Sequence, residues 1–354
     1  MRKSSRTSTK PVVGLNIEPG YVAAVQVSVN GRPSIERAAT AVLEPGVVRD
    51  GEVVDVEGLS AALRDLFREH KLPKRVRLGV ANQRIVVRTM DLPPLEDPKE
   101  LETAARFSAQ DHIPMPLDQA VLDHQLVGMV DTPDGRKARV VLVAARSDMI
   151  DRVLAAATAA GLRPDGIDLS AFAMIRALVA DQPDDEAVLY LHVGGVTNLA
   201  LAEGRRCLFT RVVPGGSELM AQELSERRGL TLEHSHGWLE HVGLEEDVTL
   251  IEGDPEIVTE ARGVLIDGVR RIADEVRNSI DFYRMQEGAV SVQRAVLTGP
   301  AVSIPGLAPA LSAEVGLDVS TGLVPVASPE AVGDIHVGRL VIAAGLAVEE
   351  VPEA

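Results

Sequence analysis

Two segments of the chain place a polar residue at the end of an apolar strand and follow it with a glycine turn. In the first segment the polar residue is Asn16 and the turn closes at Gly20. In the second it is His192, followed by Gly194 and Gly195. Turn amides can bind phosphate oxygens, and an acid at such a strand end can position hydrated magnesium. Two facing turns of this kind would hold a triphosphate from both sides.

The acids that this chemistry needs are absent at both positions. Asn16 can hydrogen-bond a metal-bound water but brings no negative charge, and His192 offers nitrogen where magnesium prefers oxygen. Glu18 and Pro19 occupy the first turn, where small residues would let backbone amides approach a phosphate. The negative charge of Glu18 would also repel a phosphate. The sequence therefore predicts a phosphate cradle that has lost its metal-handling charge.

Part of a cradle remains in the second half of the chain. Thr197 follows the second glycine turn, and Gly215 with Gly216 forms a third turn. A plain hairpin turn explains a glycine pair equally well, so the glycines alone do not select a nucleotide site.

Each polar strand is followed by two more apolar strands, so the same three-strand unit occurs twice. The following strands are 22–27 and 34–43 in the first unit, and 198–202 and 206–213 in the second. Such a repeat is typical of a duplicated α/β domain with facing halves. At 354 residues the chain also exceeds one hydrophobic core, in agreement with two lobes.

Composition narrows the class of protein further. Hydrophobic residues make up 45% of the chain and aromatic residues only 3%, which suits buried sheets covered by helices. The net charge of −16 opposes binding to nucleic acid. No apolar run approaches the length of a membrane span, so we expect a cytoplasmic protein. Cys207 is the only cysteine, which excludes an internal disulfide or a multi-cysteine metal site.

A strand, helix, strand, strand unit interrupts the first half. We expect a strand at 84–90, a helix at 98–111, and strands at 119–129 and 137–145. The apolar stripe expected on the helix consists of Leu101, Ala105 and Phe107. This order describes a small domain inserted into the first lobe.

Helices and one acidic link complete the expected chain path. Helices are predicted at 147–160 and 171–180, followed by the acidic link 181–186, where we place the boundary between the lobes. The second lobe contains its longest helix at 259–286 and ends in a helix of small residues at 341–346.

One segment concentrates potential metal ligands. It contains Glu233, His234, His236, Glu240 and His241. Histidines at this spacing could bind a metal, but without cysteine partners a solvated loop is the preferred interpretation. No serine elbow, Walker loop or dinucleotide fingerprint occurs elsewhere, so hydrolytic or redox catalysis has no support.

The repeated hairpins, the glycine pair after Arg211 and the segment 297–299 resemble the phosphate and adenosine segments of the actin-like ATPase superfamily. Within it, the insert resembles that of the cell-division protein FtsA and, more closely, that of the type IV pilus assembly protein PilM family. The resemblance to the PilM family covers residues 11–347. Its motifs are 112–118 with Asp123 and Gln125, 161–164 with Asp168 and Phe172, 275–279 with Phe282 and Tyr283, and 304–307.

The resemblance implies an actin-like, duplicated ribonuclease-H-like α/β fold of two lobes, with a strand-helix-strand-strand insert of the SHS2 type in the first lobe. The expected parts are a basic tail at 1–10, a first lobe at 11–83 and 163–185, the insert at 84–162, a second lobe at 186–347 and an acidic tail at 348–354. The tail at 1–10 is expected to be disordered, or to be attracted weakly to anionic lipid.

The resemblance also implies partners and a place in the cell. A PilM-like protein binds the short cytoplasmic amino-terminal segment of the inner-membrane protein PilN, in a groove between the first lobe and the insert. Through PilN it is linked indirectly to PilO and the pilus motor ATPase. We therefore expect a cytoplasmic protein at the inner face of the cell membrane, held there by its partner.

The family holds ATP with magnesium between the lobes. The corresponding nucleotide-binding residues here are Asn16, Gly20, His192, Gly194, Gly195, Thr197, Gly215, Gly216, Glu275 and Gly299. The chain departs from the family at both phosphate-loop acids, which are Asn16 and His192, at the glycine replaced by Glu18, and at Pro300, which removes a backbone donor.

Three functions follow from the sequence. The first is a noncatalytic pilus-assembly scaffold with a peptide groove and a degenerate nucleotide cleft. The second is an active ATP-binding and hydrolysing PilM-like protein whose nucleotide state regulates partner binding. The third is an FtsA-like role in division, which needs an amphipathic helix that the acidic, proline-containing segment 349–353 does not supply.

Overall fold

The computed structural model describes residues 11–30, 32–95, 97–133, 135–183, 186–286 and 288–348. The expected tail at 1–10, and all of the expected acidic tail except Val348, lie outside the described residues. So does part of the acidic link at the predicted lobe boundary. No helix in the described part of the chain is long and apolar enough to cross a membrane.

The first lobe is built on a five-stranded sheet with the order β10-β6-β1-β2-β3. Only the pairs β1–β2 and β2–β3 are antiparallel; β6 pairs in parallel with both β1 and β10. The strands are β1 (Val13–Glu18), β2 (Tyr21–Asn30), β3 (Arg32–Val42), β6 (Arg75–Val80) and β10 (Arg163–Leu169).

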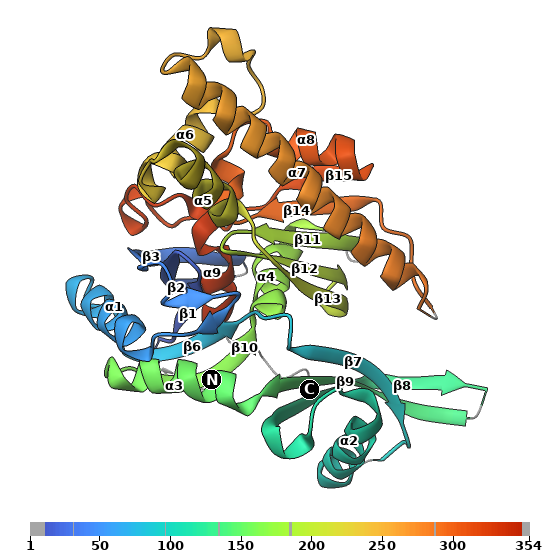
Figure 1. The fold of residues 1–354 in the computed structure, drawn as a ribbon. Helices are drawn as coiled ribbons and strands as arrows, with labels where there is room; N and C mark the ends of the chain where they lie inside the picture. Colours follow the sequence, from blue (N-terminus) through green and yellow to red (C-terminus); the bar gives the residue numbers. More distant parts are fainter. Residues whose placement is uncertain are drawn as a thin grey trace, which may run out of the picture.

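The second lobe repeats this topology with the order β13-β12-β11-β14-β15. Its strands are β11 (Ala187–Val193), β12 (Val196–Glu203), β13 (Arg206–Pro214), β14 (Arg294–Thr298) and β15 (Asp318–Thr321). All residues of β11 are buried, as expected for a central strand covered on both faces. The duplicated two-lobe fold predicted from the repeat is confirmed (Figure 1).

Helices cover the outer faces of both sheets (Figure 1). In the first lobe α1 and α3 pack together over a small hairpin formed by β4 (Val48–Arg49) and β5 (Glu52–Val53). The second lobe carries α5, α6, α7 and α8. The bounds are α1 Val56–Glu69, α3 Ser147–Ala159, α5 Ser217–Arg228, α6 Leu232–Val242, α7 Pro255–Arg284 and α8 Leu307–Val315.

The start and the buried side of the longest helix, α7, follow from its sequence. The Asp254 carboxylate accepts hydrogen bonds from the amides of Glu256 and Ile257, and Pro255 occupies the first turn. Its buried side is an apolar stripe that includes Val269, Ile272 and Val276.

Two short helices lie between the lobes. They are α4 (Ser170–Leu178) and α9 (Val341–Ala347), which pack against each other and share a buried core with both sheets. The closing helix of small residues is thus confirmed, but it packs on β1 and α4 of the first lobe. The boundary predicted for the second lobe, at residue 347, stays a prediction, because α9 shares one core with both sheets.

The insert has the expected strand, helix, strand, strand order. It consists of β7 (Val86–Leu92), α2 (Pro98–His112), β8 (Ala120–Thr132) and β9 (Gly135–Arg146), with the sheet order β7-β9-β8. Helix α2 covers one face of the sheet (Figure 1).

Two expectations about the insert require correction. Phe107 is 72% exposed, because the buried stripe of α2 runs instead through Leu101, Ala105 and Ala109. Helix α3, which was expected to end the insert, packs into the core of the first lobe with Met149, Ile150 and Val153. The insert therefore ends at β9.

Candidate functional site: the contact between the two glycine turns

The two glycine turns predicted to flank a triphosphate contact each other directly. A Cβ atom on Gly195 would lie 2.4 Å from the carbonyl oxygen of Pro19, and one on Gly194 would lie 2.4 Å from Glu18 Oε2. A Cβ on Gly216 would lie 2.3 Å from the carbonyl oxygen of Gly194. Glycine is needed at these positions because the turns pack against each other and against Glu18.

Glu18, from the end of β1, occupies the centre of this contact and is 3% exposed. The Asn16 side-chain amide donates a 2.7 Å hydrogen bond to Oε1, and the Gly195 backbone amide donates one of 2.9 Å to Oε2. His192 Nε2 lies 2.8 Å from Oε1. The turn amide predicted to bind a phosphate oxygen therefore binds a carboxylate of the same chain.

This environment changes the titration of the groups around Glu18. Burial alone raises the pKa of Glu18, but the charge and contact of His192, with the Asn16 and Gly195 hydrogen bonds, lower that pKa overall below 4.5. Burial, followed by the charge of Glu18, raises the pKa of Tyr21 well above 10.0. Glu18 is therefore ionised and Tyr21 neutral at physiological pH.

We expect the stabilisation contributed by ionised Glu18 to be lost in acid. Because its pKa is lowered in the folded protein, the contribution is complete above pH 4.5 and disappears as the pH falls through the lower folded value. Urea unfolding of the wild type and of Glu18→Gln should give a free-energy difference that is constant from about pH 7 to about pH 5 and shrinks at lower pH. The exposed Glu36→Gln is the matched control, and a wild-type–Glu18→Gln difference independent of pH would contradict the prediction.

A second carboxylate closes the site from the side of α5. The Glu218 carboxylate lies 2.9 Å from His236 Nε2, and a Cβ on Gly20 would lie 2.7 Å from the Glu218 carboxyl carbon. Any anion entering beside Gly20 would meet Glu218 as well as Glu18, so two negative charges oppose it.

Backbone groups of the predicted cradle are also engaged within the protein. Thr197 Oγ1 donates to the carbonyl oxygen of Gly215 at 2.8 Å, and the Glu218 amide donates to that of Gly194 at 3.3 Å. The second of these uses a donor at the amino end of α5, where an anion would otherwise bind.

The segment around Pro300, which is expected to lie beside adenosine, borders a small cavity. A cavity of about 10 Å³ remains between α5, α6 and the segment around Pro300, with Arg339 at its edge. Space of this size holds about one water molecule. The Arg339 guanidinium lies over the ring of Tyr21 at 5.6 Å, which joins the two lobes beside the cavity.

Three polar side chains share one level of the second sheet next to Glu18. Asn198 and Thr298 pair with His192 on the neighbouring strands β12 and β14. The Asn198 amide, the Thr298 hydroxyl and both ring nitrogens of His192 are buried without a hydrogen bond, although Nε2 lies 2.8 Å from Glu18 Oε1. Each buried polar group without a hydrogen bond lowers the free energy of unfolding by about 1–3 kcal/mol. The sheet therefore keeps these polar side chains at the site although they reduce stability.

The structure brings together nine of the ten residues expected to bind nucleotide. The exception, Glu275, pairs at 3.0 Å with Arg211 on the half-exposed side of α7. The others form or border the contact between the turns: Asn16, Gly20, His192, Gly194, Gly195, Thr197, Gly215, Gly216 and Gly299. Whether they bind nucleotide stays a prediction. Glu18, considered in the sequence only as a repelling charge, is the residue around which they gather.

The histidine-rich segment is a helix rather than the expected loop. It forms α6, which begins after Thr231, whose hydroxyl accepts a hydrogen bond from the backbone amide of His234. His241 Nε2 lies 2.8 Å from the carbonyl oxygen of Glu252. Within residues 11–348 as described, no group of three His, Cys, Asp or Glu side chains could hold a metal ion. The metal interpretation therefore gains no support.

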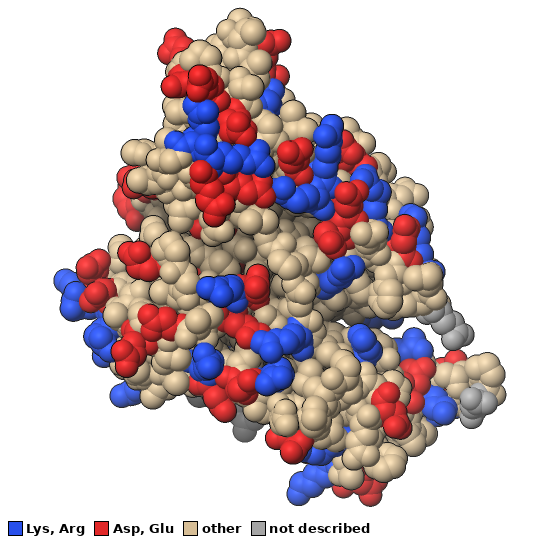
Figure 2. Space-filling view, in the orientation of Figure 1, with Lys and Arg blue, Asp and Glu red and all other residues tan. Residues whose placement is uncertain are grey.

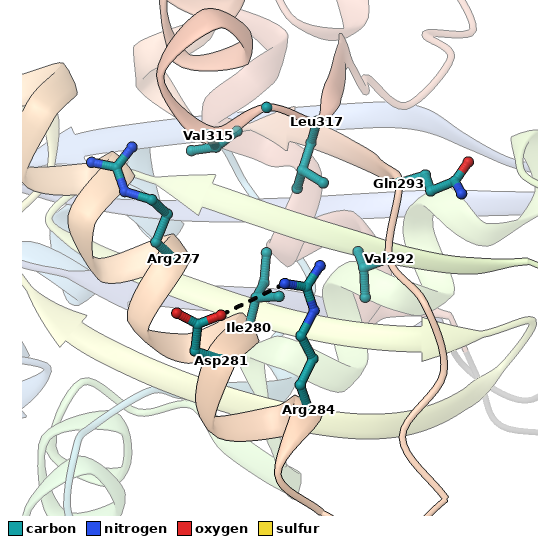
Figure 3. A pocket seen from close by; sticks show the side chains of 9 residues that line it. Arg277, Ile280, Asp281, Arg284, Val292, Gln293, Val315 and Leu317 are labelled. Carbon is teal, nitrogen blue, oxygen red and sulfur yellow. Dashed lines mark ion pairs between the residues drawn. The ribbon is translucent and has the colours of Figure 1, made fainter.

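A larger hollow of about 390 Å³ lies on the flank of the second lobe, away from the turns. Figure 3 shows Arg277 and Arg284 of α7 projecting beside it, with Asp281 between them and paired to Arg284 at 3.6 Å. Arg277 donates to the carbonyl oxygen of Glu314. Both arginines are engaged within the protein, so the hollow does not present two unpaired cations.

The face of the insert sheet opposite α2 is open over much of its length. Val87 and Val143 begin this face and pack partly against the core of the first lobe. Further along, Thr89 is exposed and Val121 is 46% exposed. Figure 2 shows a notch between the insert and the second lobe. On the same face of the sheet, a bidentate pair between Asp91 and Arg139 limits the apolar part.

Two lobes with sheets of the same topology, joined through α4 and α9, define an actin-like two-lobe α/β protein. The fold is shared by the ethanolamine utilization protein EutJ from Carboxydothermus hydrogenoformans, at 16% identity, 96% coverage of this chain, 89% of that chain and a TM-score of 0.53. It is also shared by MreB5 of Spiroplasma citri bound to ADP, at 12% identity, 95% coverage of each chain and a TM-score of 0.52.

Within this class, the chain belongs to the type IV pilus assembly protein PilM family, whose model matches residues 14–350. It is similar to a chain of the PilM-PilN type IV pilus biogenesis complex, with 26% identity, coverage of 95% of this chain and 97% of that chain, and a TM-score of 0.77. The family expected from the sequence is confirmed.

Proposed function

We propose that this protein is a scaffold of the type IV pilus, or of a pilus-like machine, that binds the amino-terminal peptide of a PilN-like membrane protein. The observation that carries the proposal is the similarity, over 95% of this chain, to a chain of a PilM-PilN complex. The proposed location is the cytoplasmic face of the inner membrane, where the partner holds the protein. Links to PilO and the motor ATPase are indirect.

The open face of the insert sheet is the proposed peptide surface. Its uncharged side chains include Val121 and Thr89, and Val87 and Val143 connect it to the first lobe. An extended apolar peptide can bury its side chains on such a face, while edge strand β8 leaves backbone groups on its outer side for pairing. This placement agrees with a groove between the first lobe and the insert.

We further propose that partner binding needs no nucleotide. MreB5, which shares the fold, is described as bound to ADP, so the architecture is compatible with a nucleotide. The residues present here fit magnesium ATP poorly, because the Glu18 carboxylate holds the Gly195 amide and would repel a phosphate, and Asn16 and His192 bring no carboxylate for magnesium. An active ATPase whose nucleotide state regulates the groove is the alternative. A nucleic-acid partner is not proposed, given the net charge of −16.

Calorimetry tests the partner and the nucleotide separately. The full chain should bind a synthetic amino-terminal peptide of the adjacent PilN-like protein with a Kd of about 1–100 μM. It should show no binding of magnesium ATP at about 1 mM, and the peptide affinity should be the same with and without ATP. A scrambled peptide is the control. No binding of the native peptide would refute the scaffold proposal, and micromolar ATP binding would favour the alternative.

A further inference from the structure

We propose that the Glu18 carboxylate is a built-in occupant of the phosphate position, which holds the two glycine turns together and keeps oxyanions out. The functional consequence, a groove that works without nucleotide, rests on the function proposed above. The proposal itself rests on contacts between the turns.

The first support is the set of partners around the carboxylate. Glu18 comes from the first lobe, and both its Gly195 amide partner and its His192 neighbour come from the second. A phosphate bound between two such turns would need the same kind of partners: a turn amide, a neutral donor and a cationic or polar group. The carboxylate supplies two of the acceptor oxygens that such a ligand would bring.

The second support is the way the surroundings fit this carboxylate. Asn16 can donate to Glu18, whereas an aspartate at that position would repel it. His192 likewise faces Glu18 at 2.8 Å, where a second acid would be repelled. Asn16, Glu18 and His192 therefore form one contact, in which an amide and an imidazole accommodate the carboxylate.

The third support is the absence of space. Gly194 has no room for a Cβ beside Glu18 Oε2 and His192 Nε2, and Gly195 has none beside Pro19. An oxyanion can enter only if the Glu18 carboxylate leaves and the turns separate. Glu18 therefore occupies the position that a phosphate would take and at the same time prevents an oxyanion from entering.

Hydrogen exchange with Glu18→Gln tests whether the carboxylate joins the turns. Hydrogen bonds to a charged acceptor contribute about 1.5–3 kcal/mol, so exchange of the Gly195 amide should become at least about tenfold faster. Glu36→Gln, at an exposed position of β3, should leave that rate unchanged. Unchanged protection of Gly195 in Glu18→Gln would refute the proposed role of Glu18 in joining the turns.

Thermal unfolding with inorganic pyrophosphate tests the blocked site. Glu18→Gly should gain a pyrophosphate-dependent increase in Tm that the wild type and Glu36→Gly lack. Adding Asn16→Asp and His192→Asp should make the gain depend on magnesium, since these changes supply the missing oxygen ligands. A wild type that responds as strongly as Glu18→Gly, or a folded Glu18→Gly that does not respond, would overturn the proposal. Neither readout involves the peptide. A failure of the peptide to bind would therefore refute the proposed function and leave the proposed role of Glu18 untouched.

Discussion

Replacement of Gly345 by alanine is expected to destabilise the protein by about 3 kcal/mol. Gly345 lies in α9 where this helix crosses α4, and a Cβ atom there would lie 1.8 Å from the carbonyl oxygen of Ala173. That oxygen belongs to a buried backbone, so no side-chain rotation relieves the clash. The two helices would have to move apart within the core that joins the lobes. Urea unfolding monitored by circular dichroism measures the loss.

Gly263→Ala is the matched control for this prediction. Gly263 lies within α7, and apart from the backbone of its own helix and its chain neighbours no heavy atom lies within 4 Å of the position of its Cβ. Because alanine favours a helix interior over glycine, this variant should be more stable by about 0.8–1 kcal/mol. If both substitutions change the free energy of unfolding equally, α4 and α9 can move apart without loss of stability, and the prediction is wrong.

A negative charge at Val121 is expected to weaken binding of the PilN-like peptide by at least about tenfold. Val121 is 46% exposed and pairs with Ala145 on the side of the insert sheet that faces the first lobe. In Val121→Asp a buried apolar contact with the peptide would be replaced by a carboxylate that must lose its hydration. Calorimetric titration of the peptide gives the change in Kd directly.

The control for this prediction is another exposed valine. Val42 is 83% exposed and lies in β3, at the opposite edge of the first-lobe sheet from β10. Val42→Asp should bind the peptide like the wild type, and both variants should retain the wild-type Tm. Thr89→Asp, on the same face as Val121, should reproduce its loss. Wild-type affinity in both insert variants would exclude this face as the peptide surface.

Much of the fold could be predicted because it depends on local patterns. The apolar strands around Asn16 and His192 repeat in the sequence, and a repeated pattern of strands produces a repeated sheet. The insert was recognisable from the periodicity change between its strands and α2. Two local expectations are wrong: Phe107 lies off the buried stripe, and the segment around His236 forms a helix rather than a loop.

Contacts between distant parts of the chain could not be predicted from local sequence patterns. The sequence placed α3 with the insert and α9 with the second lobe, since it shows order along the chain but not which core a helix enters. Likewise, the sequence does not show that Glu275 pairs with Arg211, and its predicted place among the nucleotide-binding residues stays a prediction.

By itself, the sequence determined that this is a duplicated two-lobe protein of the PilM family, with Asn16 and His192 at the ends of its repeated strands. Only the tertiary structure decided what these two residues contact. Glu18 and Gly195 are separated by most of the first lobe and the insert along the chain, yet the carboxylate of one binds the amide of the other at 2.9 Å. The sequence presents Glu18 only as a negative charge that would repel phosphate. In the folded protein its carboxylate connects the two lobes, because folding brings the Gly195 amide within hydrogen-bonding distance.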